Sequence, residues 1–143
     1  MDKKTFNKIS KERFLKYGFI KQKDKYGLIL DDITICVHLD SWNGVKCWAY
    51  TFSINALHDA SVPFYKRFDE MRITKMEHND AAKGYHRHEI LYEEYTEEEY
   101  AELLDRILHK YFDVFKENAL QYIKDNEYKF ILFPTAKEYL GLL

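Results

Sequence analysis

The dipeptide Asn43-Gly44 restricts the fold of this chain more than any other feature of its sequence. Asn-Gly is favoured in two-residue hairpin turns, because both central residues of such a turn need a positive φ. An antiparallel pair closed by this turn brings large apolar side chains together on one face. The pairs are Trp42 with Val45, Leu39 with Trp48, Val37 with Tyr50, Ile35 with Phe52, and Ile33 with Ile54. The sequence therefore predicts two long strands with a defined register and one buried face.

Further strands are predicted on both sides of this hairpin. Residues 31 and 32 suit a second two-residue turn, which adds a third strand to the same apolar face. Its pairs are Leu28 with Ile35 and Leu30 with Ile33. Residues 19–22 also read as a strand, and residues 70–78 and 84–95 look like a second hairpin that extends the sheet.

Helical periodicity is present towards both ends of the chain. Apolar residues recur at helical spacing over residues 3–17, and Gly18 stands where a helix commonly stops. Thr96 and Glu99 form a capping box before a longer amphipathic run, whose apolar pattern drifts towards its end. The drift indicates either one helix buried on more than one side or a break near Asn118, and the length of the run favours the break.

The C-terminal end completes the predicted fold. Residues 128–133 fit either a last strand or a buried turn, and Thr135 with Glu138 repeats the capping signature before a short final helix. The elements together predict an α+β fold with an N-terminal helix and an antiparallel sheet of about five or six strands. The C-terminal helices are expected to pack on one face of the sheet. Residues 1–143 are expected to form one domain.

Composition and charge exclude several classes of protein. Apolar residues make up 46% of the 143 residues and aromatic residues 17%, too many for a disordered chain. Lys and Arg number 22 against 24 Asp and Glu, and this net charge of −2 gives no basic excess for nucleic acid. No apolar run reaches the roughly 18 to 20 residues that cross a bilayer, and the N-terminal residues lack a secretory signal. We therefore expect a cytoplasmic protein that binds neither nucleic acid nor membrane.

The two cysteines, Cys36 and Cys47, are expected to stay reduced. The predicted register places Cys47 opposite Asp40, roughly 13 Å along the sheet from Cys36, which is too far for a disulfide. His38 shares that face with Asp40 and Cys47, an arrangement that could suggest a thiol nucleophile with a base and an acid. A carboxylate beside Cys47 disfavours the thiolate, however, so we expect no catalytic role.

His86 and His88 are the residues that most suggest chemistry. They lie one residue apart in an alternating stretch, so a strand would point both imidazoles to the same side, roughly 6 to 7 Å apart. His78, across the predicted hairpin, or Glu89 could complete a zinc-like site. Apolar residues share that face, however, and two ordinary surface histidines are the alternative. No glycine-rich phosphate loop, Cys-x-x-Cys pair or Gly-x-Ser-x-Gly elbow occurs, and we expect no cofactor.

Acidic residues gather between Glu93 and Glu102, beside tyrosines and near the start of a predicted helix. The helix dipole favours acidic side chains at a helix N-terminus, which is enough to explain such a run. Exposed carboxylates beside tyrosines can also dock a basic partner and speed its association, as in a neutraliser of a basic toxin or nuclease. The candidate residues for such an interaction surface are Glu93, Glu94, Tyr95, Glu97 and Glu98.

Two short stretches carry a resemblance to a known family. The first, at the end of the first predicted helix, consists of Leu15, Lys16, Gly18 and Phe19; the second, on a predicted strand, consists of Phe52, Ser53, Ile54 and Asn55. They resemble an uncharacterised bacterial family known as domain of unknown function 4304, with serine in place of a threonine in the second stretch. The resemblance covers roughly residues 1–57. It implies the same α+β architecture and supplies no catalytic residues, because the family has no known activity.

The sequence leads to two hypotheses about function. The first is a small non-catalytic domain that binds a protein partner or a second copy of itself, because aromatic content is high and polar clusters of catalytic type are missing. The second is a metal-dependent, hydrolase-like enzyme centred on His86 and His88. Rings of these two histidines that point apart would exclude the second hypothesis.

Overall fold

The computed structural model describes residues 1–42, 45–73 and 89–142. The helices are α1 (Lys3–Tyr17), α2 (Glu97–Phe112), α3 (Ala119–Asp125) and α4 (Pro134–Tyr139). The strands are β1 (Ile20–Gln22), β2 (Lys25–Ile29), β3 (Ile33–Trp42), β4 (Val45–Ile54), β5 (Met71–Ile73), β6 (Glu89–Ile90) and β7 (Phe130–Leu132). Short 3₁₀ turns are η1 (Asn55–Leu57), η2 (Phe64–Lys66), η3 (Tyr92–Glu94), η4 (Asp113–Phe115) and η5 (Glu127–Lys129).

Helix α1 begins and ends where the sequence predicts. The Asp2 carboxylate accepts a hydrogen bond from the Thr5 N–H at 2.8 Å, which caps the first turn. Gly18 stops the helix with a φ of 123°, and its N–H donates to the Leu15 carbonyl at 3.2 Å. The periodic apolar residues form the buried stripe of the helix, which consists of Phe6, Ile9 and Phe14 together with Ser10. The predicted helix over residues 3–17 is confirmed.

The predicted sheet register is confirmed along β2, β3 and β4. Residues 43 and 44 themselves lie outside the described residues, but the strands that flank them pair as the Asn-Gly turn requires. These pairs include Trp42 with Val45, Val37 with Tyr50, Ile33 with Ile54, and Leu28 with Ile35. The strand order is β1-β2-β3-β4-β5-β7, with β6 also on β4. Because β3 holds one edge of β4, strands β5 and β6 share its other edge, and the sheet is six strands wide.

The described parts of the predicted second hairpin extend the sheet as predicted but do not pair with each other, and residues 74–88 lie outside the described residues. The sequence predicts that residues 70–78 pair with residues 84–95, whereas the described parts of both stretches pair with β4. The other edge of β5 is occupied by β7, in which Leu132 lies opposite Met71. In the ambiguous stretch 128–133, residues 130–132 are therefore a strand, while residues 128 and 129 belong to the turn η5. The partner of this strand, β5, is far away along the chain, and a local alternation of apolar and polar residues carries no information about such a pairing.

Helix α2 has the predicted capping box. The Thr96 hydroxyl accepts from the Glu99 N–H, and the Glu99 carboxylate accepts from the Thr96 N–H, both at 3.1 Å. The predicted break near Asn118 is confirmed, because this residue adopts a φ of 52° between η4 and α3. The first turn of α3 is capped from outside the helix. There the Asp32 carboxylate, in the turn between β2 and β3, accepts from the Leu120 N–H at 2.9 Å.

Helix α4 has a different cap from the predicted one. The sequence predicts that Thr135 caps the helix with Glu138, but the helix begins at Pro134 and the residue before it, Phe133, is the N-cap. Proline suits the first helical position, because its fixed φ is helical and the N–H that it lacks would have no partner in the helix. The capping box predicted for Thr135 and Glu138 is therefore wrong.

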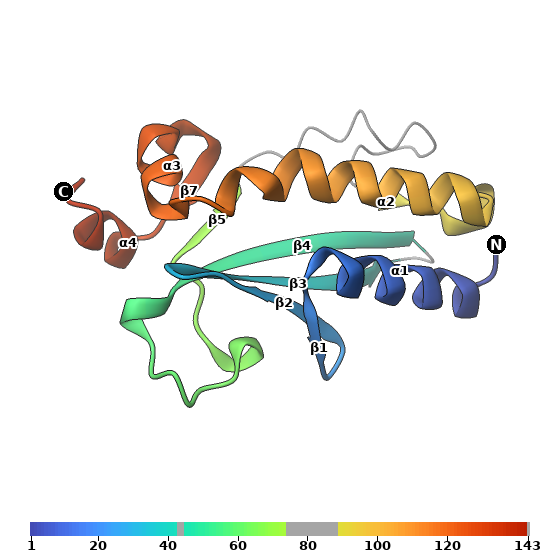
Figure 1. Cartoon of the computed structure of the whole chain (residues 1–143), viewed down its shortest axis with the longest axis horizontal. Coiled ribbons are helices and arrows are strands. Elements are labelled where there is room, and N and C mark those ends of the chain that lie inside the picture. The colour runs from blue at the N-terminus through green and yellow to red at the C-terminus, as the bar shows by residue number, and fades with distance from the viewer. Residues whose placement is uncertain (43–44, 74–88, 143) are drawn as a thin grey trace.

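Helices α1 and α2 lie side by side on one face of the sheet (Figure 1). The Ser10 hydroxyl ties them together, since it donates to the Phe6 carbonyl at 2.8 Å and lies 2.6 Å from the Tyr100 hydroxyl. Helices α3 and α4 contribute Ala119, Ile123 and Ala136 to the same core. The prediction of an α+β fold with C-terminal helices on one face of the sheet is confirmed. The largest fully buried side chains are Tyr100, Phe6, Phe14, Phe19, Phe52 and Phe112.

The opposite face of the sheet is covered in part by the segment that joins β4 to β5. Phe64 of this segment is buried over Gly27 of β2. Thr34 and Ser53 are buried on the same face, at the end of the sheet from which the segment starts.

Replacing Gly27 by valine should lower the free energy of unfolding by about 1 to 3 kcal/mol. A Cβ atom at this position would lie 2.7 Å from the Phe64 ring, which must then move although valine itself suits a strand. Urea unfolding followed by circular dichroism measures the loss. The same substitution in a Phe64→Ala background should cost less, because the ring is absent. Equal costs in the two backgrounds would contradict this contact.

Candidate functional site

The three histidines proposed as metal ligands, His78, His86 and His88, lie outside the described residues. Glu89, their possible companion, begins β6 and lies opposite Cys47 of β4. In the part of the chain that the structure describes, no three His, Cys, Asp or Glu side chains are grouped so that they could hold a metal ion. The metal site therefore stays a prediction from the sequence.

The two cysteines occupy the register positions that the sequence predicts. Cys47 lies opposite Asp40 and Cys36 lies opposite Thr51, so the two residues are on separate rungs of the β3–β4 ladder. Cys36 is a free, buried thiol. Burial raises the pKa of the Cys36 thiol, which favours the unreactive neutral form. Cys36 thus acts as a small buried side chain rather than as a nucleophile.

The four glutamates of the predicted interaction surface are exposed near the start of α2. Glu93 and Glu94 belong to η3, and Glu97 and Glu98 form the first turn of α2. Tyr95 differs from this expectation, because it is only 6% exposed and its ring packs edge-on against Tyr100. The turn η3 directs Tyr95 into the core, so this residue is not part of the surface.

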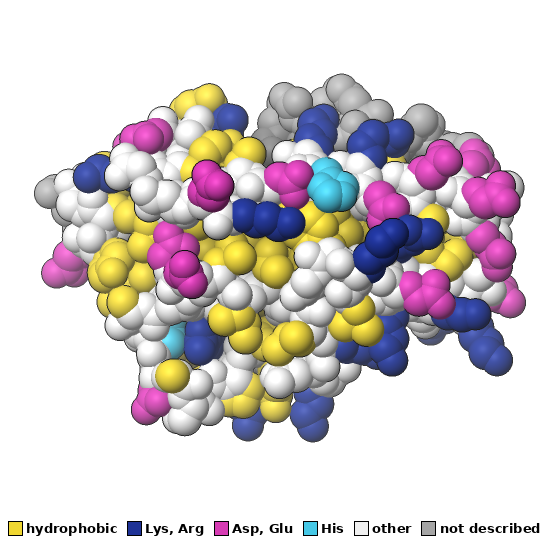
Figure 2. All heavy atoms as spheres, viewed as in Figure 1, with side chains coloured by type: hydrophobic (Ala, Val, Ile, Leu, Met, Phe, Trp, Pro, Cys, Tyr) yellow, Lys and Arg dark blue, Asp and Glu magenta, His cyan; other side chains and the backbone are white. Residues whose placement is uncertain are grey.

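A groove between α1 and α2 continues this acidic surface. It encloses about 390 Å³, and Ile9 and Ala101 lie along it where the two helices meet. Its charged lining consists of Lys8, Glu12 and Arg13 from α1 and of Glu97, Glu98, Glu102 and Asp105 from α2. Figure 2 shows Asp and Glu side chains gathered at the end of the molecule where α2 begins. We call this feature the acidic groove.

The acidic groove carries more negative charge than its own cations neutralise. Its five carboxylates stand against two cationic side chains, a net charge of −3. The Arg13 guanidinium is paired with the Asp105 carboxylate at 3.0 Å. Within the described residues the other four carboxylates, Glu12, Glu97, Glu98 and Glu102, make no ion pair. The groove can therefore attract a cationic group without first releasing an internal one.

Sequence reasoning missed part of this groove. Glu98, Glu102 and Asp105 follow one another at helical spacing, and that period could have placed them on one face of the helix. Glu12 belongs to the groove only because α1 packs beside α2, and no pattern within either helix predicts that contact.

A second polar cluster lies where the β4–β5 segment crosses the sheet. Glu70 and His58 form a largely buried carboxylate–imidazole pair, and the second carboxylate oxygen of Glu70 accepts from the Ile54 N–H at 2.8 Å. Arg67 Nη1 donates to the Thr34 hydroxyl at 3.2 Å and to the Asn55 side-chain oxygen at 3.1 Å. These polar groups are bound to one another and to the backbone, so the cluster fixes the segment to the sheet.

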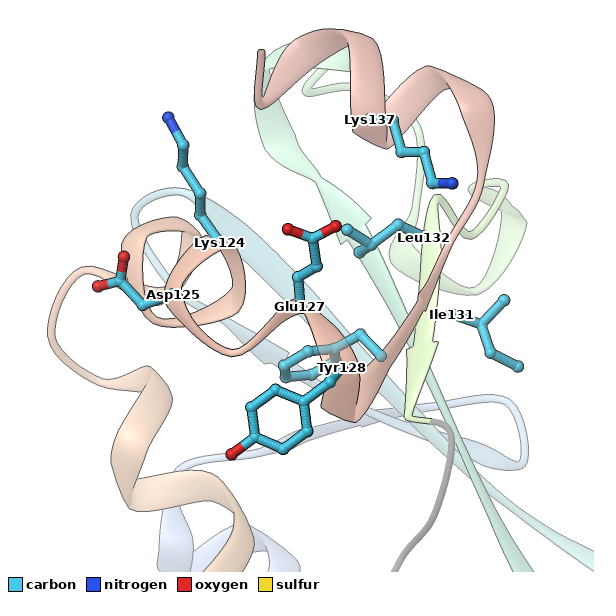
Figure 3. A pocket seen from close by; sticks show the side chains of 8 residues that line it. Lys124, Asp125, Glu127, Tyr128, Ile131, Leu132 and Lys137 are labelled. Carbon is cyan, nitrogen blue, oxygen red and sulfur yellow. The ribbon is translucent and has the colours of Figure 1, made fainter. Parts of the chain in front are cut away.

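A third feature is a hollow of about 660 Å³ beside β7. Figure 3 shows that it is bounded by α3 and η5 on one side and by α4 on the other, with Glu127 pointing into it. Ile131 and Leu132 project from opposite sides of β7. The hollow is lined by the apolar residues of β7 and by charged residues on both sides of them, and the cations among these lining side chains are Lys124 and Lys137. This composition suits contact with a protein better than enclosure of a small molecule.

Comparison with known proteins does not indicate a function for this chain, so its function is inferred from the geometry of the described residues. No family model, curated protein or solved structure matches the chain. Among the described residues, no helix is both long and apolar enough to cross a membrane. The resemblance to domain of unknown function 4304 therefore depends on the two quoted stretches alone. They lie at the end of α1, around Gly18, and at the end of β4, around Asn55.

Proposed function

We propose that this protein is a non-catalytic cytoplasmic domain that binds a protein partner with a basic surface. The acidic groove between α1 and α2 is the proposed binding surface. The observation that carries the proposal is the groove's net charge of −3, with four of its carboxylates outside any ion pair within the described residues. Apolar side chains at the bottom and charged side chains at the rim are also the usual anatomy of a protein interface.

The helix dipole does not account for the whole groove. It favours acidic side chains only within the first turn of a helix, which explains Glu97 and Glu98. Glu102 and Asp105 lie beyond that turn, and Glu12 belongs to another helix. Carboxylates that gather from two helices raise the local negative potential, which speeds the approach of a basic partner and makes binding sensitive to salt.

Reversing charge in the groove should weaken partner binding at least tenfold, about 1.4 kcal/mol. The variant carries Glu98→Lys and Glu102→Lys, two exposed residues of the groove that make no ion pair among the described residues. Basic proteins are first retained on the immobilised wild-type domain and identified by mass spectrometry. The purified partner is then titrated against wild type and variant by calorimetry at several salt concentrations.

The matched control carries Asp24→Lys and Glu117→Lys, which change the net charge equally but lie outside the groove. Its affinity for the partner should equal that of wild type at physiological salt. Equal loss in the two variants would mean that overall charge, rather than the groove, determines binding. No loss in either would contradict the proposal.

The alternative of a metal-dependent, hydrolase-like enzyme stays a prediction. It depends on His86 and His88, which lie outside the described residues, and nothing in the described part of the chain favours it.

A further inference from the structure

The two edges of the sheet differ in their fitness for pairing with another strand. At one edge, β1 is exposed and has Lys21 at its centre. A lysine on an edge strand hinders strand addition, because its charge would lose contact with water. At the other edge, β7 consists of Phe130, Ile131 and Leu132, none of which is charged. Within the described residues no strand pairs with the outer edge of β7, and the 660 Å³ hollow lies beside it.

The backbone of β7 offers a donor and an acceptor at this outer edge. On the inner side, the Phe133 N–H donates to the Glu70 carbonyl at 3.1 Å. Successive residues of a strand point their N–H and C=O groups to opposite edges. The Leu132 N–H and the Phe130 carbonyl therefore point away from β5. The Phe130 N–H is already used, since it donates to the Glu127 carbonyl within η5.

Large apolar side chains are exposed around the same short edge. Ile131 is 47% exposed and Tyr128 is 77% exposed. Because Ile131 is the middle residue of β7, a two-fold axis through it would place its side chain beside the same side chain of a second copy. Pairs that face each other across antiparallel strands lie roughly 5 Å apart, close enough for mutual burial.

The charges around the hollow are complementary under the same two-fold rotation. On the η5 side, Asp125 and Glu127 stand against Lys124, a net charge of −1. On the α4 side, Lys137 is the charged side chain that lines the hollow. An antiparallel arrangement of two copies brings the η5 side of each against the α4 side of the other, so opposite charges meet. This self-complementarity favours a second copy over an unrelated strand as the occupant.

We propose that two copies of this chain associate by antiparallel pairing of β7 with β7, across a two-fold axis at Ile131. The Leu132 N–H of each copy donates to the Phe130 carbonyl of the other, and the two sheets become continuous. The dimer does not obstruct the acidic groove, because β7 and the start of α2 lie at opposite ends of the molecule (Figure 1). The inference is independent of the proposed function, since it concerns a different surface.

Charge substitution at Ile131 tests the axis directly. In an Ile131→Lys or an Ile131→Glu protein, each dimer would place two like charges side by side, so either variant alone should associate at least tenfold more weakly than wild type. An equimolar mixture of the two should recover a dimer, because opposite charges then meet at the axis. Analytical ultracentrifugation over a concentration series measures the association. Native mass spectrometry identifies the heterodimer by its mass.

Two further variants complete the test. Ile29→Lys changes another exposed isoleucine on the same face of the sheet, far from β7 in strand order, and should associate like wild type. Lys137→Glu leaves the strand unchanged and should weaken association by placing negative charge against the η5 side.

The proposal is overturned if wild type stays monomeric at all concentrations, if the Ile131 variants dimerise like wild type, or if their mixture does not recover a dimer. A monomer that binds an unrelated strand at β7 would also overturn it.

Discussion

Replacing Glu70 by alanine should lower the free energy of unfolding by about 3 to 5 kcal/mol, because each of two buried polar groups that lose their partner costs roughly 1 to 3 kcal/mol. The Glu70 side chain is only 8% exposed, and its two oxygens bind the His58 imidazole and the Ile54 N–H. Its loss leaves both of these groups buried without their partner. Urea unfolding monitored by circular dichroism measures the change.

The control for this prediction is Glu117→Ala, which removes an exposed carboxylate and should change stability by at most about 0.5 kcal/mol. Glu70→Gln keeps the shape and one acceptor oxygen, so its cost should lie between those of the two alanine variants. If Glu70→Ala is as stable as wild type, the β4–β5 segment is not held by this carboxylate.

Replacing Phe112 by alanine should lower the free energy of unfolding by a similar amount, about 3 to 5 kcal/mol. Phe112 is the last residue of α2 and is fully buried. Its ring centroid lies 5.7 Å from that of Phe19 and 5.1 Å from that of Tyr50, so it joins the helix to the sheet. Removal of the ring loses both the burial and the packing contacts around the space that it leaves. Thermal and urea unfolding measure the cost.

The neighbouring Val114 provides the control, because it is partly exposed and its replacement by alanine should cost at most about 0.5 kcal/mol. Phe112→Leu should be intermediate, since it leaves a smaller space. A Phe112→Ala protein with the stability of the Val114→Ala protein would show that the end of α2 does not contribute to the core.

Local chemistry predicts much of this fold. Asn43-Gly44 predicts the pairing of the two longest strands, because a two-residue turn allows one register and the apolar alternation agrees with it. Caps and stops predict α1 and the start of α2, because Gly18 and Thr96 satisfy backbone groups within a few residues. The partner of β5 could not be predicted in this way. Whether β5 pairs with β6 or with β7 depends on contacts between residues far apart in the chain, and no local turn predicts these contacts.

The candidate site, too, could be predicted from the sequence only in part. The exposed glutamates of the first turn of α2 follow from the sequence, because a helix N-terminus favours acidic side chains. The inward direction of Tyr95 could not be predicted, since it depends on the 3₁₀ turn η3 that precedes it. Glu12 joins the groove only through the packing of two helices, and Glu70 becomes buried only where its segment crosses the sheet.

The carboxylate of Asp32 has a consequence for the order in which the chain folds. Helix α3 has only seven residues, fewer than an isolated helix needs to be stable in water. During synthesis the β2–β3 turn is complete long before residue 120 exists, so its carboxylate is in place when the Leu120 N–H arrives. We therefore expect α3 to form on a template supplied by the N-terminal half of the chain. A fragment that begins after β3 would contain the whole sequence of this helix without the group that starts it.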